Sequence, residues 1–210
     1  MKKGVVLLIT LFFISTISLL VLKNLDDTDK FLVEQNYVLN NTQVLISIKN
    51  TKDEVSKLLK KYKDEVDKIL AEGLIVLPIN LEGLNIIISF DIYDRVNIND
   101  IKKESSTTVK DLFISYNISN YNDFESIYKE KLSKSNQKVQ TNKQLDDIIS
   151  TFIKKVENKK IEEIRDYLGF IDAENLYELN ISSSYLTTKA EAVYLLNKEG
   201  KVQYFDISFK

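Results

Sequence analysis

The sequence predicts an α+β protein with a long N-terminal helix and a small antiparallel sheet that carries a helical insert. Three patterns predict this class. An uncharged apolar run near the N-terminus leads into apolar residues spaced seven apart, the C-terminal segment alternates in hydrophobicity, and the middle carries apolar residues three and four apart. A chain of 210 residues that is 44% hydrophobic is long enough to bury such a core.

The N-terminal helix begins with an apolar run, Val5 to Leu22, that holds no charged residue. As a helix this run spans ~27 Å, close to the ~30 Å hydrocarbon core of a bilayer. Lys2 and Lys3 precede it, so the positive-inside rule predicts a single-pass anchor with a cytoplasmic N-terminus. A cleaved signal peptide fits less well, because the run is long and no Ala-x-Ala site follows. A buried helix of a soluble domain is the remaining alternative.

The same helix is expected to extend past the membrane surface to about Ile48. Two columns of apolar residues, each repeating every seven positions, predict one apolar stripe along it. The stripe consists of Leu25, Leu32, Leu39 and Ile46, with Phe31, Val38 and Leu45 beside them. It must pack either on the chain's own globular part or on other copies of similar stems.

A second helix is expected over residues 52–72, with Thr51 as its N-cap and Gly73 as its end. A β-hairpin follows, in which residues 74–79 and 84–92 flank a turn at 80–83.

Apolar spacing then predicts four helices, over residues 109–116, 121–132, 144–156 and 160–168, with a polar connection at 133–143. The chain ends in a predicted antiparallel hairpin. Its strands cover residues 186–196 and 202–209, and the turn is at 197–200. Phe205, Ile207 and Phe209 fall on one face of the last strand.

The composition argues against an enzyme. The chain has neither cysteine nor histidine, which removes the thiol nucleophile, the commonest general base and the commonest metal ligands. Asp91 with Asp94, or Glu162 with Glu163, could form an acid–base pair, but no nucleophile motif accompanies either pair. No catalytic or cofactor-binding residue is therefore expected.

Calcium and nucleic acid are two other candidate ligands. An oxygen-rich cluster could hold calcium, but its spacing lacks the glycine of a calcium loop and favours turn and capping roles. This cluster comprises Asp91, Asp94, Asn97, Asn99, Asp100 and Glu104. Tyrosines lie among lysines in the helical region, but acidic neighbours balance them and the net charge is −2, which gives no support for nucleic-acid binding.

Three segments in this order resemble the K-type minor pseudopilins of type II secretion systems, within the type IV pilin-like superfamily. Lys3-Gly4-Val5 and the apolar residues after it look like a prepilin cleavage motif. Residues 95–99 are similar to the segment that opens that family's helical insert, and residues 182–185 with the last two strands are similar to its closing segment. Ile9 stands where most pilins have glutamate; K-type members also lack it.

The resemblance implies a pseudopilin-like arrangement of six parts. They are a leader at 1–4, a transmembrane helix at 5–22, a periplasmic extension of the stem at 23–48, a helix with a β-hairpin at 49–96, a helical insert at 97–177 and a C-terminal hairpin at 178–210. A prepilin peptidase would cut between Gly4 and Val5. The chain would then remain in the inner membrane with its bulk in the periplasm.

The implied function is a place at the tip, or in the initiation, of a pseudopilus that supports protein export. The implied partners are other minor pseudopilins, inner-membrane assembly proteins and membrane lipid, without a cofactor. Two alternatives stay open. One is a membrane-anchored periplasmic scaffold or adaptor, and the other is a pilin-like component of a DNA-uptake machine, for which nucleic acid would be a partner.

Overall fold

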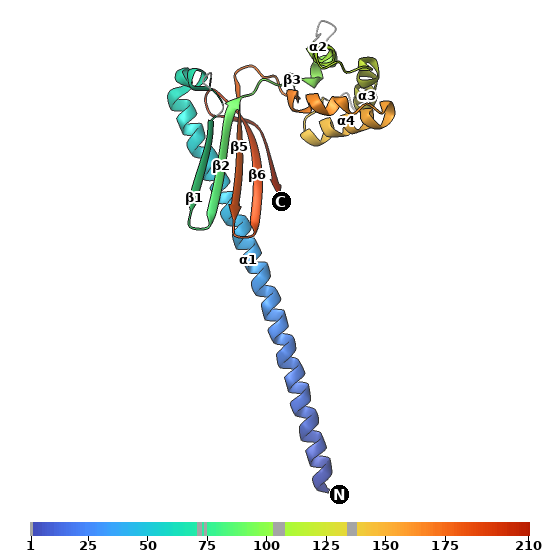
Figure 1. Cartoon of the computed structure of the whole chain (residues 1–210). Helices are drawn as coiled ribbons and strands as arrows, with labels where there is room; N and C mark the ends of the chain where they lie inside the picture. Colours follow the sequence, from blue (N-terminus) through green and yellow to red (C-terminus); the bar gives the residue numbers. More distant parts are fainter. Residues whose placement is uncertain (1, 71–72, 74, 103–107, 134–137) are drawn as a thin grey trace.

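The computed structural model describes residues 2–70, 73, 75–102, 108–133 and 138–210, without the side chains of residues 2–19, 63, 64, 102 and 133. It is an α+β structure in which a long N-terminal helix lies against a small antiparallel sheet, as the sequence predicts (Figure 1). A helical unit is joined to the end of the sheet that lies away from the N-terminus. We call this end of the molecule the upper end.

Helix α1 (Lys2–Leu70) is one element of 69 residues. The expected boundary between a stem ending near Ile48 and a second helix capped by Thr51 is wrong, because Thr51 lies inside α1. Residues 5–70 contain neither glycine nor proline, so no residue type that breaks helices occurs at the expected boundary. The one irregular residue is Tyr62 (φ −115°, ψ 21°), where the helix kinks.

Within the part of the chain that the structure describes, no helix is both long and apolar enough to cross a membrane. The predicted span at 5–22 lies almost wholly among residues whose side chains are not described.

The sheet has five antiparallel strands in the order β1-β2-β5-β6-β7. They are β1 (Ile75–Leu81), β2 (Leu84–Ile92), β5 (Leu176–Tyr185), β6 (Thr188–Asn197) and β7 (Val202–Phe209). The predicted β1–β2 and β6–β7 hairpins are confirmed. Strand β5, at the centre of the sheet, was not predicted. The strand expected to start at Leu186 starts at Thr188, because Leu186 lies in the β5–β6 turn with φ 51°.

The main core lies between α1 and the middle of the sheet. Val44, Ile48 and Leu59 of α1 are buried against alternate residues of β2, β5 and β6. The sheet residues of this core include Ile88, Phe90, Leu179, Ile181 and Ala192. Because side chains alternate across a strand, one face of the sheet supplies all of them.

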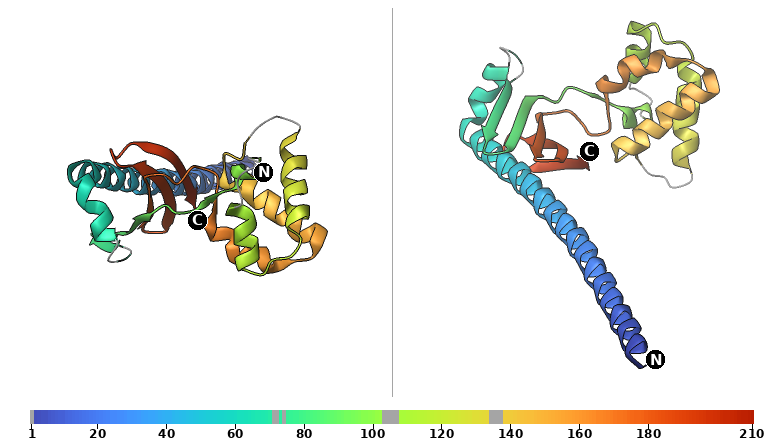
Figure 2. Two further views of the ribbon diagram at one scale, coloured as in Figure 1. Left: turned by 90° about the horizontal axis from the view of Figure 1, so that it is seen from above. Right: turned by 60° about the horizontal axis from the view of Figure 1, so that its bottom comes forward.

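The helical unit comprises β3 (Val96–Asn97), a 3-10 helix η1 (Ile98–Lys102), α2 (Thr108–Ser115), α3 (Tyr121–Ser133), α4 (Asn142–Val156), a 3-10 helix η2 (Lys159–Tyr167) and β4 (Leu168–Gly169). The fourth predicted helix is thus a 3-10 helix. Strands β3 and β4 pair in parallel, so the chain enters and leaves the unit side by side. The unit has its own core, which includes Phe113, Phe124 and Phe152. Figures 1 and 2 show it beside the sheet, away from the kinked end of α1.

A buried asparagine holds the entry of this unit together. Asn99 is 6% exposed. Its Nδ2 donates to the carbonyls of Val139 and Phe170, both at 3.0 Å, and its Oδ1 accepts from Val139 N at 2.8 Å and Tyr128 Oη at 3.0 Å. Burial, with a smaller contribution from Asp100, raises the pKa of Tyr128 to about 12, so its hydroxyl stays a donor.

We predict that Asn99→Ala lowers the free energy of unfolding by about 2–4 kcal/mol, because it leaves buried donors and acceptors without partners. Urea denaturation of the purified full chain measures the change. Asn122→Ala on the exposed side of α3 is the matched control and should stay within about 0.5 kcal/mol of the native chain. Equal effects of the two changes would contradict this role of Asn99.

Candidate functional site

The predicted stem-packing residues lie on the exposed part of α1. Leu25, Leu32, Leu39 and Ile46 are 57, 52, 57 and 46% exposed, whereas Val44 and Ile48 are almost fully buried. Ile46 lies two residues beyond Val44, roughly 200° around the helix. The stripe therefore faces away from the sheet, and it does not pack on the chain's own globular part.

A different set of α1 residues makes the contact with the sheet. Val44, Ile48, Val55 and Leu59 are spaced four, seven and four apart and lie on the opposite side of the helix from the stripe. Ser47 adds a buried hydrogen bond, at 2.6 Å, between its Oγ and Ser183 Oγ of β5. This spacing is visible in the sequence, but the seven-residue repeat beside it is more regular and indicates a different packing face.

The residues of the predicted leader and cleavage site cannot be compared with the structure in the same way. Gly4, Val5 and Ile9 fall within α1, but their side chains lie outside the described residues.

The upper end of α1 is fixed to the sheet by one carboxylate. Asp67 accepts hydrogen bonds from Lys198 Nζ at 2.8 Å and from Tyr177 Oη at 2.5 Å. The bond from Lys198, then that from Tyr177, holds the pKa of Asp67 below its usual value, while burial and Asp67 raise the pKa of Tyr177. These bonds hold the segment beyond the Tyr62 kink on β5 and on the β6–β7 turn.

An apolar groove of about 230 Å³ lies beside this end of α1, between the helix and strand β1. Leu58, Tyr62 and Ile69 line it from the helix, and Leu77 lines it from β1. Apart from Tyr62 with its hydroxyl, the residues that line the groove carry only apolar side chains.

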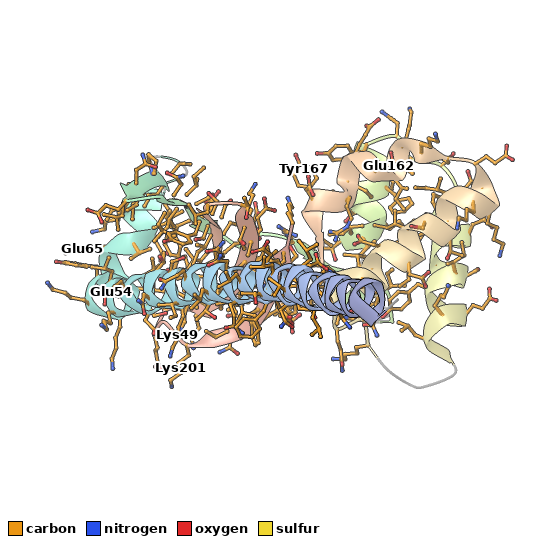
Figure 3. All side chains as sticks on the ribbon, turned by 90° about the horizontal axis from the view of Figure 1, so that it is seen from below. Lys49, Glu54, Glu65, Glu162, Tyr167 and Lys201 are labelled. Atoms are coloured by element: carbon orange, nitrogen blue, oxygen red, sulfur yellow. The ribbon has the colours of Figure 1, made fainter. Side chains whose placement is uncertain are left out.

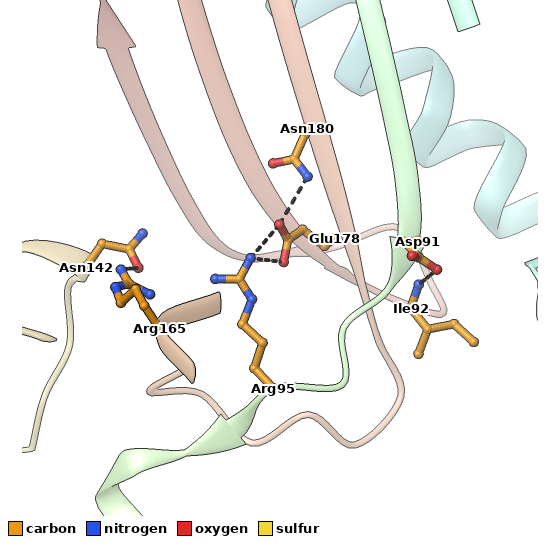
Figure 4. Close-up of polar contacts among 7 residues, drawn as sticks. All are labelled: Asp91, Ile92, Arg95, Asn142, Arg165, Glu178 and Asn180. Carbon is orange, nitrogen blue, oxygen red and sulfur yellow. Dashed lines mark hydrogen bonds and ion pairs between the residues drawn. The ribbon is translucent and has the colours of Figure 1, made fainter. Parts of the chain in front are cut away.

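Where the helical unit meets the sheet, the contact is partly aromatic, with the Phe170 and Tyr204 rings 5.0 Å apart, and partly ionic. Arg95 donates from its Nη2 to Glu178 of β5 at 2.8 Å, and Asn180 Nδ2 donates to the same carboxylate at 3.0 Å (Figure 4). The Arg95 guanidinium also lies 5.6 Å from the centre of the Tyr93 ring. Arg95 therefore ties the strand leading into the unit to the centre of the sheet.

Among the described residues, the carboxylates considered for calcium binding do not gather into a metal site, although Asp91 and Asp94 line one open cleft. Asp91 Oδ1 accepts from the backbone of Ile92 at 2.8 Å, and Asn97 Oδ1 from that of Asn99 at 3.0 Å, which are turn and capping roles. Glu162 is exposed on the helical unit, apart from α1 (Figure 3). No cluster of three acidic groups suited to a metal occurs among the described residues, and Glu104 lies outside them.

No family model, no curated protein and no solved structure matches the chain. Its function is therefore inferred from its own residues and their geometry.

Gly169, at the exit of the helical unit, allows the close approach of Tyr93. A Cβ at this position would overlap Tyr93 Oη and lie 3.1 Å from Arg95 Cβ. We predict that Gly169→Ala destabilises the chain by about 1–3 kcal/mol, because this packed junction must open to admit it. Thermal unfolding checks this, and adding Tyr93→Phe, which removes the overlapping hydroxyl, should restore part of the loss. No recovery in the double variant would contradict this cause.

Proposed function

We propose that this chain is a minor pseudopilin-like subunit of a type II secretion apparatus, similar to K-type members. It acts at the tip or in the initiation of the pseudopilus and supports protein export. The supporting observation is that two parts of α1 make different contacts. One part of the helix carries the sheet, while the part nearer the N-terminus projects freely with an apolar stripe that its own sheet does not cover.

The exposed stripe needs a partner because its leucines and phenylalanine would otherwise face water. All residues from 20 to 39 are exposed. Burying a leucine or phenylalanine side chain contributes about 1.5–3 kcal/mol of stabilisation, so covering the stripe would strongly favour association with a partner. Helices of neighbouring stems, packed side by side, are the natural cover for a helical stripe of this length.

The distribution of exposed apolar residues supports a place at the end of a filament. In the described part of the helical unit, the large exposed hydrophobic residues are Ile114 and Tyr167. The stem exposes many more, from Leu20 to Ile46. A subunit with neighbours along its stem and none beyond its helical unit would have this polarity.

The N-terminal residues contribute the remaining elements of the proposal. A peptidase would remove residues 1–4, and residues 5–22 would hold the chain in the inner membrane until assembly. A glutamate at the fifth mature position could offset a neighbour's N-terminal amine in low dielectric; Ile9 cannot. A subunit without that charge tolerates a position with no subunit above it. The role is structural, without catalysis or a cofactor.

We predict that Leu32→Glu abolishes incorporation into the pseudopilus and reduces export at least about tenfold, because it buries a charge between apolar stems. Lys57→Glu, on an exposed part of α1 above the stripe, is the control and should export like the native chain. Both are measured as secreted protein and as pseudopilus-associated subunit in the host. Equal tolerance of the two changes would count against a packed stem.

A further inference from the structure

The apolar stripe of the stem is bordered by carboxylates on both sides. Viewed along the helix, two apolar columns flank an uncharged middle column of Thr28, Gln35 and Thr42. Asp27 and Glu34, seven residues apart, lie just outside one apolar column, and Asp29 lies just outside the other. All three side chains are exposed, and none has a hydrogen-bond or ion-pair partner among the described residues.

The lysines of this part of the stem lie elsewhere. Lys23 and Lys30 fall on the opposite side of α1 from the stripe, and Lys30 pairs there with Asp26 at 2.6 Å. The acidic borders are therefore not neutralised within the chain. Residues 23–43 carry two lysines and four carboxylates, and three of those carboxylates border the stripe.

This arrangement disfavours pairing of the stem with itself. If the chain has its proposed function, every copy has its N-terminus in the same membrane, so two stems run parallel with their residues at equal heights. In a symmetric parallel pair, the border beside one apolar column faces the opposite border of the other copy, so Asp27 and Glu34 of each stem would lie near Asp29 of the other. Charges beside the apolar seam of paired helices set the choice and orientation of the partner.

We propose that the stripe binds one parallel helix of a different stem, whose own apolar stripe is bordered by lysine or arginine at the heights of Asp27, Asp29 and Glu34. The apolar columns supply the affinity, and the acidic borders reject a second copy and select the basic companion. This inference rests on the proposed function and adds to it the chemistry of the neighbouring subunit.

The probe for such a companion is the chain itself with its borders reversed by Asp27→Lys, Asp29→Lys and Glu34→Lys. Because the chain has no cysteine, Gln35→Cys places one thiol in the middle of the stripe. Two full-length chains are compared, one with the native carboxylates and one with the three lysines. Each carries this cysteine and a tag of a different size. They are co-expressed in a bacterial inner membrane and oxidised. The mixed cross-linked product should exceed each same-border product roughly tenfold, and added salt should reduce the preference.

Two controls isolate the cause. Moving the cysteine to Val33, on the opposite side of α1, should abolish cross-linking of the mixed pair. With native chain as partner, Glu34→Lys alone should raise the mixed product, whereas Asp26→Lys, an equal charge change away from the stripe, should not.

Products in statistical proportions would overturn the proposal, because the borders would then select nothing. So would the absence of cross-linking in every combination, because the stripe would then bind no helix. The readout needs neither leader cleavage nor export. Failure here is thus distinguishable from failure of the proposed function, which is judged by incorporation and secretion.

Discussion

The structure depends on the continuity of α1 from the stem to its kink at Tyr62. The helix contains neither glycine nor proline from residue 5 to the kink, so this stretch can carry two independent contact surfaces at a fixed angle to each other. Val44, Ile48 and Leu59 attach the sheet to one side, while the apolar stripe stays on the other. Because the stripe and the sheet contacts Val44 and Ile48 lie on the same stretch of helix, the position of the stripe relative to the sheet is fixed.

The sheet in turn fixes the helical unit relative to the stem. That unit has a separate core, so its placement rests on a few contacts where the two linking segments leave the sheet. They include Arg95 with Glu178, Tyr93 against Gly169 and Phe170 against Tyr204. At the kinked end of α1, Asp67 fixes the helix to the sheet by accepting hydrogen bonds from Tyr177 and Lys198. Small polar contacts thus set the geometry between units whose stability comes from apolar burial.

The sequence predicted the elements whose periodicity is strong. The N-terminal helix, the β1–β2 hairpin and the last two strands follow from apolar spacing alone. Local signals failed where tertiary packing overrode them. Thr51 looks like an N-cap, but Ile48 before it and Leu59 after it are both buried, and the helix continues through Thr51. In β5 the alternation of Tyr177, Leu179 and Ile181 is short and ends in a run of serines, and the strand is defined by its two neighbours.

The candidate site could be predicted only in part. Periodicity identifies the stripe, but which side of α1 meets the sheet depends on contacts with residues more than a hundred positions away, such as Ser183 with Ser47. The role of Asn99 is likewise tertiary, because its partners come from α3, from Val139 and from Phe170. A pattern of oxygen-bearing residues cannot by itself separate such a network from a metal site.

The N-terminal residue of the mature chain tests the central claim most directly. Intact-mass and peptide mass spectrometry of the membrane-extracted protein, expressed in its own host, would identify it. The account predicts a chain that begins at Val5, the product of leader removal after Gly4. A chain that still begins at Met1 would contradict it and would favour a membrane-anchored scaffold whose likeness to pseudopilins is one of architecture alone.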